Sequence, residues 1–193
     1  IVNRIARPYY TEALRIYEEG LADIAEIDYA MTNHLGFKMG PFTLMDFIGH
    51  DVNYAVTKSV WESCYYEPRY KPSITQKNLV FAGWYGKKSG RGFYNYSILD
   101  SSKEVTYSQD NIPAIANRIL YMLINEAVDA LYYKIASYED IELSMTKGVN
   151  YPKGLLSWAK EIGVQKVADE MDALYSMYHE ERYKRSMGFN LIK

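Results

Sequence analysis

The chain opens with Ile1-Val2-Asn3-Arg4-Ile5-Ala6-Arg7-Pro8-Tyr9-Tyr10-Thr11-Glu12-Ala13, and its architecture follows from this stretch because parts of it return later. Asn117-Arg118-Ile119 repeats Asn3-Arg4-Ile5, and Glu126-Ala127 repeats Glu12-Ala13, each at an offset of 114 residues. At that offset, residues 3–49 match the later segment at 12 of 47 positions without a gap. Helical periodicity alone does not produce such identities, glycines among them, so the sequence indicates an internal repeat.

The repeat extends well beyond the first helix. After one single-residue deletion, Arg69-Tyr70-Lys71-Pro72-Ser73 corresponds to Arg182-Tyr183-Lys184-Arg185-Ser186. We therefore predict two tandem copies of one helical unit, at 1–96 and, in degenerate form, at 113–193, joined by a polar linker at 97–112. The two copies are expected to pack about a pseudo-twofold axis, through mutual contacts of the kind that an isologous dimer makes.

Start and stop signals place the helices within each copy. Pro8 lies inside the first helix and should bend it or mark a local break. Asp23 and Ser137 stand at matching places before helical runs and are expected to cap them. Pro41 suits the first turn of a helix that ends at Ile48, and we expect Asp51 to cap the next one.

The strongest strand candidate in the sequence, Val105-Thr106-Tyr107, is too short to carry a sheet. The predicted class is therefore all-α.

Composition excludes several roles. The net charge of −2 gives no support for nucleic acid or an anionic membrane as a partner. No apolar run approaches the roughly 20 residues of a membrane span, and no signal peptide is visible. Cys64 is the single cysteine, so the chain has no intrachain disulfide, and we expect Cys64 to be a small buried residue. A cytoplasmic location is the expectation.

One glycine-rich, basic stretch raises the question of a phosphate-binding motif. It reads Gly83-Trp84-Tyr85-Gly86-Lys87-Lys88-Ser89-Gly90-Arg91-Gly92-Phe93-Tyr94. Only two residues separate Gly83 from the Gly86-Lys87 pair, whereas a P-loop needs four. A dinucleotide fingerprint would need a glycine where Asn95 stands, and no strand precedes the stretch. We interpret it as a structural turn followed by an aromatic anchor.

No complete set of catalytic or metal-binding residues is apparent. The three histidines, His34, His50 and His179, have no partner at metal-ligand spacing, and we interpret them as surface or capping residues. No nucleophile elbow or Ser-His-Asp order is present. The residues alone indicate a duplicated helical domain without an active site of its own.

Five linked motifs nevertheless resemble a known family. In order and spacing, residues 1–96 resemble the C-terminal domain of 3-hydroxyacyl-CoA dehydrogenase. The second copy resembles the degenerate copy of longer members, such as 3-hydroxybutyryl-CoA-type enzymes, although Leu155 replaces a Pro and Lys160 stands where Asp46 does. The motifs are Ile1-Val2-Asn3-Arg4, Pro8-Tyr9 with Glu12-Ala13, Ala25-Glu26-Ile27-Asp28-x-Ala30-Met31, Met39-Gly40-Pro41-Phe42-x-Leu44-x-Asp46, and Gly86 to Tyr94.

The resemblance implies a fold and an activity. The fold would be two helical bundles of the 6-phosphogluconate dehydrogenase C-terminal-like type. The chain starts two residues into the family's Gly-Phe-Ile-x-Asn-Arg motif, so we expect a preceding Rossmann domain that holds NAD and the catalytic His–Glu pair. No cofactor is expected in this chain. Its partners would be that domain, an acyl-CoA substrate of the kind oxidised in fatty acid β-oxidation, and a second subunit in a homo-oligomer.

The resemblance also assigns site residues. Asn3 matches the family's active-site Asn, whose amide helps to orient the substrate's 3-oxygen; the alternative is a helix-start cap. Asn117 recurs with Arg118 at the matching place, which favours a structural role for the Asn-Arg pair. Met39, Gly40 and Pro41 resemble a loop near the acyl group; the alternative is that Gly40 and Pro41 simply start a helix and Met39 fills the core.

Two readings of function remain open at this stage. The first is the substrate-binding and dimerisation part of an NAD-dependent enzyme that oxidises (S)-3-hydroxyacyl-CoA to 3-oxoacyl-CoA. The second is a non-enzymatic helical module for dimerisation or acyl-CoA binding.

Overall fold

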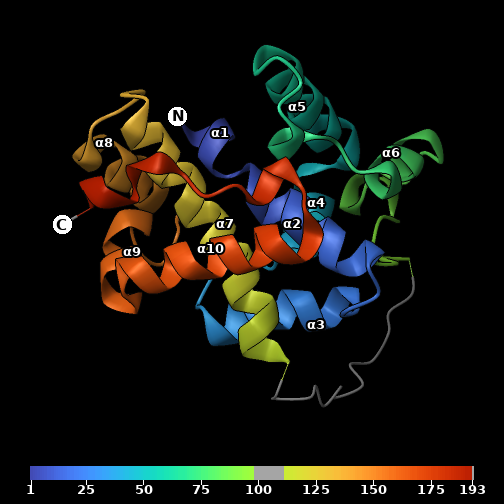
Figure 1. The fold of residues 1–193 in the computed structure, drawn as a ribbon. Coiled ribbons are helices and arrows are strands. Elements are labelled where there is room, and N and C mark those ends of the chain that lie inside the picture. Colours follow the sequence, from blue (N-terminus) through green and yellow to red (C-terminus); the bar gives the residue numbers. More distant parts are fainter. Residues whose placement is uncertain (98–110, 193) are drawn as a thin grey trace.

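A computed structural model describes residues 1–97 and 111–192, and within these ranges all regular secondary structure is helical (Figure 1). Two isolated β-bridges, Gly86–Arg91 and Arg91–Asn95, are the only β-type pairings within these ranges. The strand candidate at 105–107 lies outside the described residues. The α-helices are α1 (Val2–Ile5), α2 (Arg7–Glu18), α3 (Ile24–Tyr29), α4 (Pro41–Ile48), α5 (His50–Ser63), α6 (Ile74–Phe81), α7 (Ile112–Tyr132), α8 (Tyr138–Leu143), α9 (Leu155–Ile162) and α10 (Val164–Tyr178).

The short helical turns fall at matching places in the two parts of the chain, which we call the N-terminal half (1–96) and the C-terminal half (113–193). The π-helical turns Ala30–His34 and Ser144–Gly148 follow α3 and α8. The 3-10 turns Pro68–Tyr70 and Glu181–Tyr183 follow α5 and α10. Two further 3-10 turns, Lys87–Ser89 and Met187–Leu191, have no such counterpart.

Matching elements begin and end at corresponding positions, and the breaks between helices also correspond. α4 and α9 begin and end 114 residues apart, and so do the two π-helical turns. Gly49 and Gly163, which separate α4 from α5 and α9 from α10, have φ angles of 97° and 102°. Glycine adopts this region without the steric cost that a Cβ imposes. From α3 to Tyr70 and from α8 to Tyr183, the order of elements is the same in the two halves, whereas α6 has no α-helical counterpart among the described residues of the C-terminal half.

The opening helix differs between the halves, as Pro8 predicts. Ala6 separates α1 from α2, and Pro8 stands in the first turn of α2. Its counterpart 114 residues later is Met122, inside the continuous 21-residue helix α7. The predicted break at Pro8 is confirmed.

The capping predictions have mixed outcomes. The side chains of Asp23 and Ser137 accept hydrogen bonds from the backbone N–H of Glu26 and Asp140, as expected. The prediction for Asp51 is wrong, because α5 begins at His50 after Gly49 and has no side-chain cap. Asp51 instead accepts a hydrogen bond of 2.7 Å from Lys88, since the turn after α6 returns to the start of α5.

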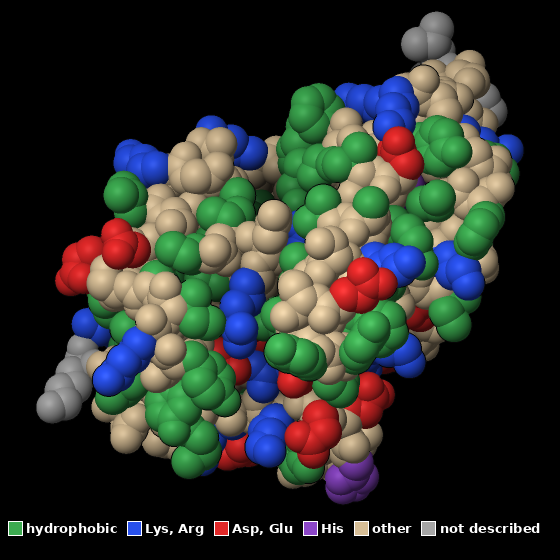
Figure 2. Space-filling view, turned by 90° about the horizontal axis from the view of Figure 1, so that it is seen from above, with side chains coloured by type: hydrophobic (Ala, Val, Ile, Leu, Met, Phe, Trp, Pro, Cys, Tyr) green, Lys and Arg blue, Asp and Glu red, His purple; other side chains and the backbone are tan. Residues whose placement is uncertain are grey.

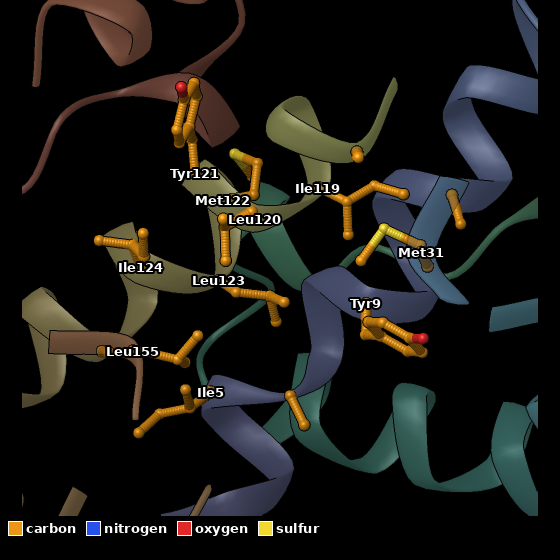
Figure 3. Packing of buried hydrophobic residues seen from close by; sticks show 14 of the residues in the cluster. Ile5, Tyr9, Met31, Ile119, Leu120, Tyr121, Met122, Leu123, Ile124 and Leu155 are labelled. Atoms are coloured by element: carbon orange, nitrogen blue, oxygen red, sulfur yellow. The ribbon is translucent and has the colours of Figure 1, made fainter. Parts of the chain in front are cut away.

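One hydrophobic core spans both halves. α7 runs through the middle of the molecule beside α2 (Figure 1), and its buried face joins the two sets of helices. Because the core is shared, the halves are not separately packed domains. Figure 3 shows side chains from both halves in one cluster, and all of the following are at most 1% exposed: Ile5, Tyr9, Met31, Ile119, Leu123 and Leu155.

Candidate functional site

Asn3 lies on α1, exposed, and its side chain makes no hydrogen bond within the part of the chain that the structure describes. The alternative of a helix-start cap is not supported, because Ile1 occupies the N-cap position and no side chain caps α1. Asn117 is half-buried and lies more than one turn inside α7. Neither Asn therefore has a capping role, and the Asn3 amide is free to bind a ligand.

The backbone under Asn3 is held firmly in place. Arg7 donates a hydrogen bond from Nε to the carbonyl oxygen of Asn3, at 3.1 Å. Ile5, two residues on, is completely buried. A short isolated helix has little stability of its own, so these contacts are what fix the orientation of α1.

The loop Met39-Gly40-Pro41 is fixed by Asp28. The Asp28 carboxylate accepts hydrogen bonds from the N–H groups of Phe42 (2.8 Å) and Thr43 (2.9 Å), the first free donors of α4. A Cβ on Gly40 would lie 2.3 Å from the Asp28 Cγ, so only glycine fits there. These contacts give Gly40 and Pro41 a structural reason to be present, which is the alternative stated above.

The C-terminal half repeats this device with different residues. Glu142 stands at the position of Asp28 and accepts hydrogen bonds from the N–H groups of Leu156 (2.9 Å) and Ser157 (3.2 Å). A Cβ on Gly154 would lie 2.0 Å from its Oε2. Leu155 can replace a proline here because the carboxylate, not the ring, organises the start of α9.

Met39 has a different position from its neighbours. It is half-buried, and its carbonyl oxygen accepts a 2.5 Å hydrogen bond from the Tyr9 hydroxyl. It lines a cavity of about 170 Å³ together with Phe37, Leu44 and, from the C-terminal half, Tyr151. Of the three loop residues, Met39 is thus the one with access to an open space.

A buried pair that the sequence analysis missed organises the glycine-rich stretch. His50 is 0% exposed and its Nε2 lies 2.7 Å from the Asp46 Oδ1, so the prediction of a surface or capping histidine is wrong at this position. His34 and His179 are exposed, and His179 ends α10 in the left-handed region. Asp46 lies near the end of α4 and His50 begins α5, so the break at Gly49, and not a shared helix face, brings the two side chains together.

Asp46 also binds the stretch that follows the glycines. Its carboxylate accepts hydrogen bonds from the N–H groups of Phe93 and Tyr94, both at 2.9 Å, and from the Tyr96 hydroxyl at 3.0 Å. A Cβ on Gly92 would lie 2.1 Å from the Asp46 Oδ1. Burial acts to raise the pKa of Asp46, but these bonds and that from His50 together hold the pKa below its ordinary value.

The glycine-rich stretch is therefore a structural turn with an aromatic anchor, as predicted. Two of its backbone N–H groups, those of Phe93 and Tyr94, donate to the Asp46 carboxylate, and those of Gly86, Ser89, Gly90 and Gly92 donate to carbonyl oxygens within the turn. Among residues 1–97 and 111–192, no group of His, Cys, Asp and Glu side chains is arranged to hold a metal ion, and no helix is long and apolar enough to cross a bilayer. Cys64 is half-buried rather than buried.

Two buried ionic networks join the halves, and each places an acid of one half against bases of the other. Glu12 accepts from Arg118 Nε at 2.7 Å and from the Tyr183 hydroxyl at 2.6 Å. Glu126 accepts from Arg69 at 2.8 Å and also from the Tyr70 hydroxyl. Such reciprocity is what an isologous two-fold contact produces.

The surface shows no region dominated by one charge in the view of Figure 2. On that face, Lys and Arg side chains alternate with Asp and Glu side chains and with apolar patches. This distribution agrees with the net charge of −2. It offers no electrostatic footprint for a nucleic acid on this face.

The fold defines an all-helical domain in two matching parts. The chain belongs to the 3-hydroxyacyl-CoA dehydrogenase C-terminal domain family, whose family model matches residues 1–96 and again 115–190. It is 32% identical to 3-hydroxyadipyl-CoA dehydrogenase of Escherichia coli K12, over 95% of this chain and 57% of that protein. It is 42% identical to human mitochondrial hydroxyacyl-coenzyme A dehydrogenase, over 50% of this chain and 31% of that protein.

A solved structure has the same arrangement over almost the whole chain. The crystal structure of 3-hydroxybutyryl-CoA dehydrogenase from Escherichia coli K12 matches 99% of this chain and 58% of its own, with a TM-score of 0.89 and 30% identity. The chain thus spans little more than half the length of this relative. The all-α prediction and the family resemblance are confirmed.

Proposed function

We propose that this chain is the substrate-side part of an NAD-dependent enzyme that oxidises (S)-3-hydroxyacyl-CoA to 3-oxoacyl-CoA. NAD and the acid–base pair would belong to a Rossmann domain outside these residues, because the glycine-rich stretch here is closed on Asp46. The observation that carries the proposal is the match of one family model to both halves, together with the free amide of Asn3 in the first.

Asn3 would orient the substrate in this scheme. Its exposed amide N–H would donate a hydrogen bond to the substrate's 3-oxygen, and α1 would hold that donor in a fixed position through Arg7 and Ile5. A fixed donor aimed at developing charge contributes about 2.7–4 kcal/mol to catalysis. Met39 would line the space for the acyl group, since it borders the cavity between the halves.

The C-terminal half would play the part of a second subunit's domain. The equivalent contacts Tyr183–Glu12 and Tyr70–Glu126 support this proposal, because an isologous dimer of single-copy domains would make the same contact twice. Asn117 lies beside a cleft of about 390 Å³ that Tyr121, Lys166 and Tyr178 also line. We propose that this cleft faces no second Rossmann domain and is not catalytic. A homo-oligomer would then form through other surfaces.

The test uses the full-length protein with NAD and (S)-3-hydroxybutyryl-CoA. We expect NADH to form with the full-length protein, and neither activity nor saturable NADH binding, measured by calorimetry, with this chain alone. Saturable NADH binding to the chain alone would contradict the placement of the cofactor. A full-length protein that binds acyl-CoA but never reduces NAD would favour the non-enzymatic binding module instead.

A further inference from the structure

Arg4 and Arg118 occupy equivalent positions in the two halves, but the surroundings of their guanidinium groups differ. Arg118 donates from Nε to Glu12 at 2.7 Å, and from Nη1 and Nη2 to the two carboxylate oxygens of Glu19, at 2.8 and 3.0 Å. Two tyrosine hydroxyls accept its remaining N–H donors. Every hydrogen-bond donor of the Arg118 guanidinium is therefore used, and its main partner is a bidentate carboxylate.

Arg4 has none of these hydrogen bonds within the part of the chain that the structure describes. Its Nε lies 3.9 Å from Glu126, the counterpart of Glu12, and this nitrogen is buried without a partner. The Glu126 carboxylate is instead occupied by Arg69 and by the Tyr70 hydroxyl. The Arg4 side chain is 28% exposed, so its unused donors can be reached from solvent.

One replacement in the sequence explains why Arg4 lacks a carboxylate partner. Glu19 corresponds to Tyr133 at the offset of 114 residues, so a neutral ring stands where the acid that binds Arg118 would be. Arg4 and Tyr133 both border a cavity of about 420 Å³, which lies between the two halves. The N-terminal half thus keeps the arginine of the pair, and a cavity takes the place of its acid.

The other charged side chains that line this cavity leave Arg4 as its available cation. Three further bases border the cavity, and each has an acid within 3.6 Å. Among the lining acids, Glu67 has no ion pair within residues 1–97 and 111–192, and its charge would oppose an anion rather than bind one. The three pairs are Arg69 with Asp129, Lys184 with Glu181, and Arg185 with Asp172.

Exposed apolar side chains border the same cavity. Tyr133, Ile135 and Met187 line it and are 62%, 41% and 71% exposed. A ligand that covered these three side chains would remove apolar surface from water, which favours binding. The cavity therefore combines one unpaired guanidinium with an apolar wall.

We propose that Arg4 and this cavity form a binding site for a small monocarboxylate with an apolar tail. The carboxylate accepts two hydrogen bonds from Arg4, as Glu19 does from Arg118, and the tail lies along the apolar wall. A phosphate group fits less well, because its second negative charge would face Glu67. Neither Asn3 nor Met39 borders the cavity, so the site adds to the substrate contacts proposed above and does not repeat them.

The test measures binding of hexanoate to the full-length protein by titration in saturation-transfer NMR. We expect saturable binding of hexanoate, and no saturable binding of 1-hexanol or inorganic phosphate at the same concentrations. Arg4→Met should weaken the binding of hexanoate about tenfold or more, because it removes both charge-assisted hydrogen bonds. Glu67→Gln should strengthen it severalfold, because it removes a like charge from the cavity.

A second pair of variants tests the internal comparison itself. Tyr133→Glu supplies the acid that Glu19 provides in the other half, so it should pair with Arg4 and abolish hexanoate binding. The exposure of Tyr133 allows this change without loss of the fold, which a thermal melt checks. Tyr133→Gln is the matched control without the charge and should still bind hexanoate.

Three outcomes would overturn the inference. The first is a wild-type protein that shows no saturable binding of hexanoate. The second is binding that persists unchanged in folded Arg4→Met or Tyr133→Glu. The third is equal binding of inorganic phosphate and hexanoate, since the site would then select an anion without regard to the carboxylate or its tail.

Discussion

The Tyr183 hydroxyl donates a hydrogen bond of 2.6 Å to Glu12 across the boundary between the halves. Tyr70, the counterpart of Tyr183, donates in the same way to Glu126, the counterpart of Glu12. Both carboxylates are at most 1% exposed, so neither can be satisfied by solvent. Each half therefore provides an acid whose hydrogen-bond donors come from the other half, and this exchange specifies how the halves are placed.

Removing one of these acids should destabilise the protein strongly. Glu126→Ala leaves Tyr70 without its acceptor and takes one of two carboxylates from Arg69, which keeps Asp129. Breaking a buried ion pair by removing one partner typically costs about 3–5 kcal/mol. Urea unfolding of this chain, followed by circular dichroism, measures the loss. The control is Glu62→Ala, which breaks the half-exposed pair with Lys58 and should cost at most about 0.5 kcal/mol.

Asn3→Ala should lower kcat/KM of the full-length enzyme by roughly 10²–10³, the effect of one lost donor to a developing oxyanion. Stability should change by less than about 0.5 kcal/mol, because Asn3 is exposed and caps no helix. Steady-state kinetics and urea unfolding give the two values. The matched change Asn117→Ala should leave the kinetics near normal. Full activity in both mutants would show that the assignment of Asn3 as catalytic is wrong.

Gly92→Ala should disrupt the turn that closes on Asp46. The added Cβ would lie 2.1 Å from a carboxylate oxygen that also receives Phe93 and His50, so the segment must shift and lose these bonds. We expect a loss of about 3 kcal/mol or more. Gly83→Ala is the control, because a Cβ there meets nothing within 4 Å and only the positive φ is unfavourable. Its expected cost is about 1–2 kcal/mol. Equal losses in the two mutants would contradict this interpretation of the turn.

Asp46 should make stability depend on acid pH. Its pKa is lower in the folded chain than the ordinary value of 3.8, so the unfolded chain takes up a proton first as the pH falls. The stabilisation is complete above pH values near 3.8 and is lost as the pH falls through the folded-state pKa. Urea unfolding from pH 7 to pH 3 should show the difference between wild type and Asp46→Asn shrinking below about pH 4. A difference that stays constant to pH 3 would count against the ionised form of Asp46.

Much of the architecture could be predicted because its signals are local. Pro8, Pro41 and Gly49 mark helix boundaries through their own backbone restrictions, and their effects do not depend on distant residues. The π-helical turns carried no such signal, since an extra residue in a turn is accommodated by packing. The capping prediction for Asp51 was wrong because its hydrogen-bond partner is Lys88, which is distant in sequence, and not a backbone N–H at the start of α5.

The candidate site was only partly predictable. Asn3 and Met39 could be assigned from the resemblance, but the burial of His50 depends on a turn that arrives from residues 86–96. The repeat identified Glu12 and Glu126 as equivalent without revealing that each contacts the opposite half.

Because Glu12 and Glu126 are each bound by residues of the opposite half, the two halves cannot be exchanged independently for those of a relative. A half taken from a relative would have to bring an acid and a set of bases that match those of the resident half, so successful chimeras should exchange both members of each pair. The same constraint favours reassembly of the protein from two separate polypeptides. A cut between the halves would leave Glu12 and Glu126 each dependent on the other piece, so the two pieces should find one another as complementary fragments.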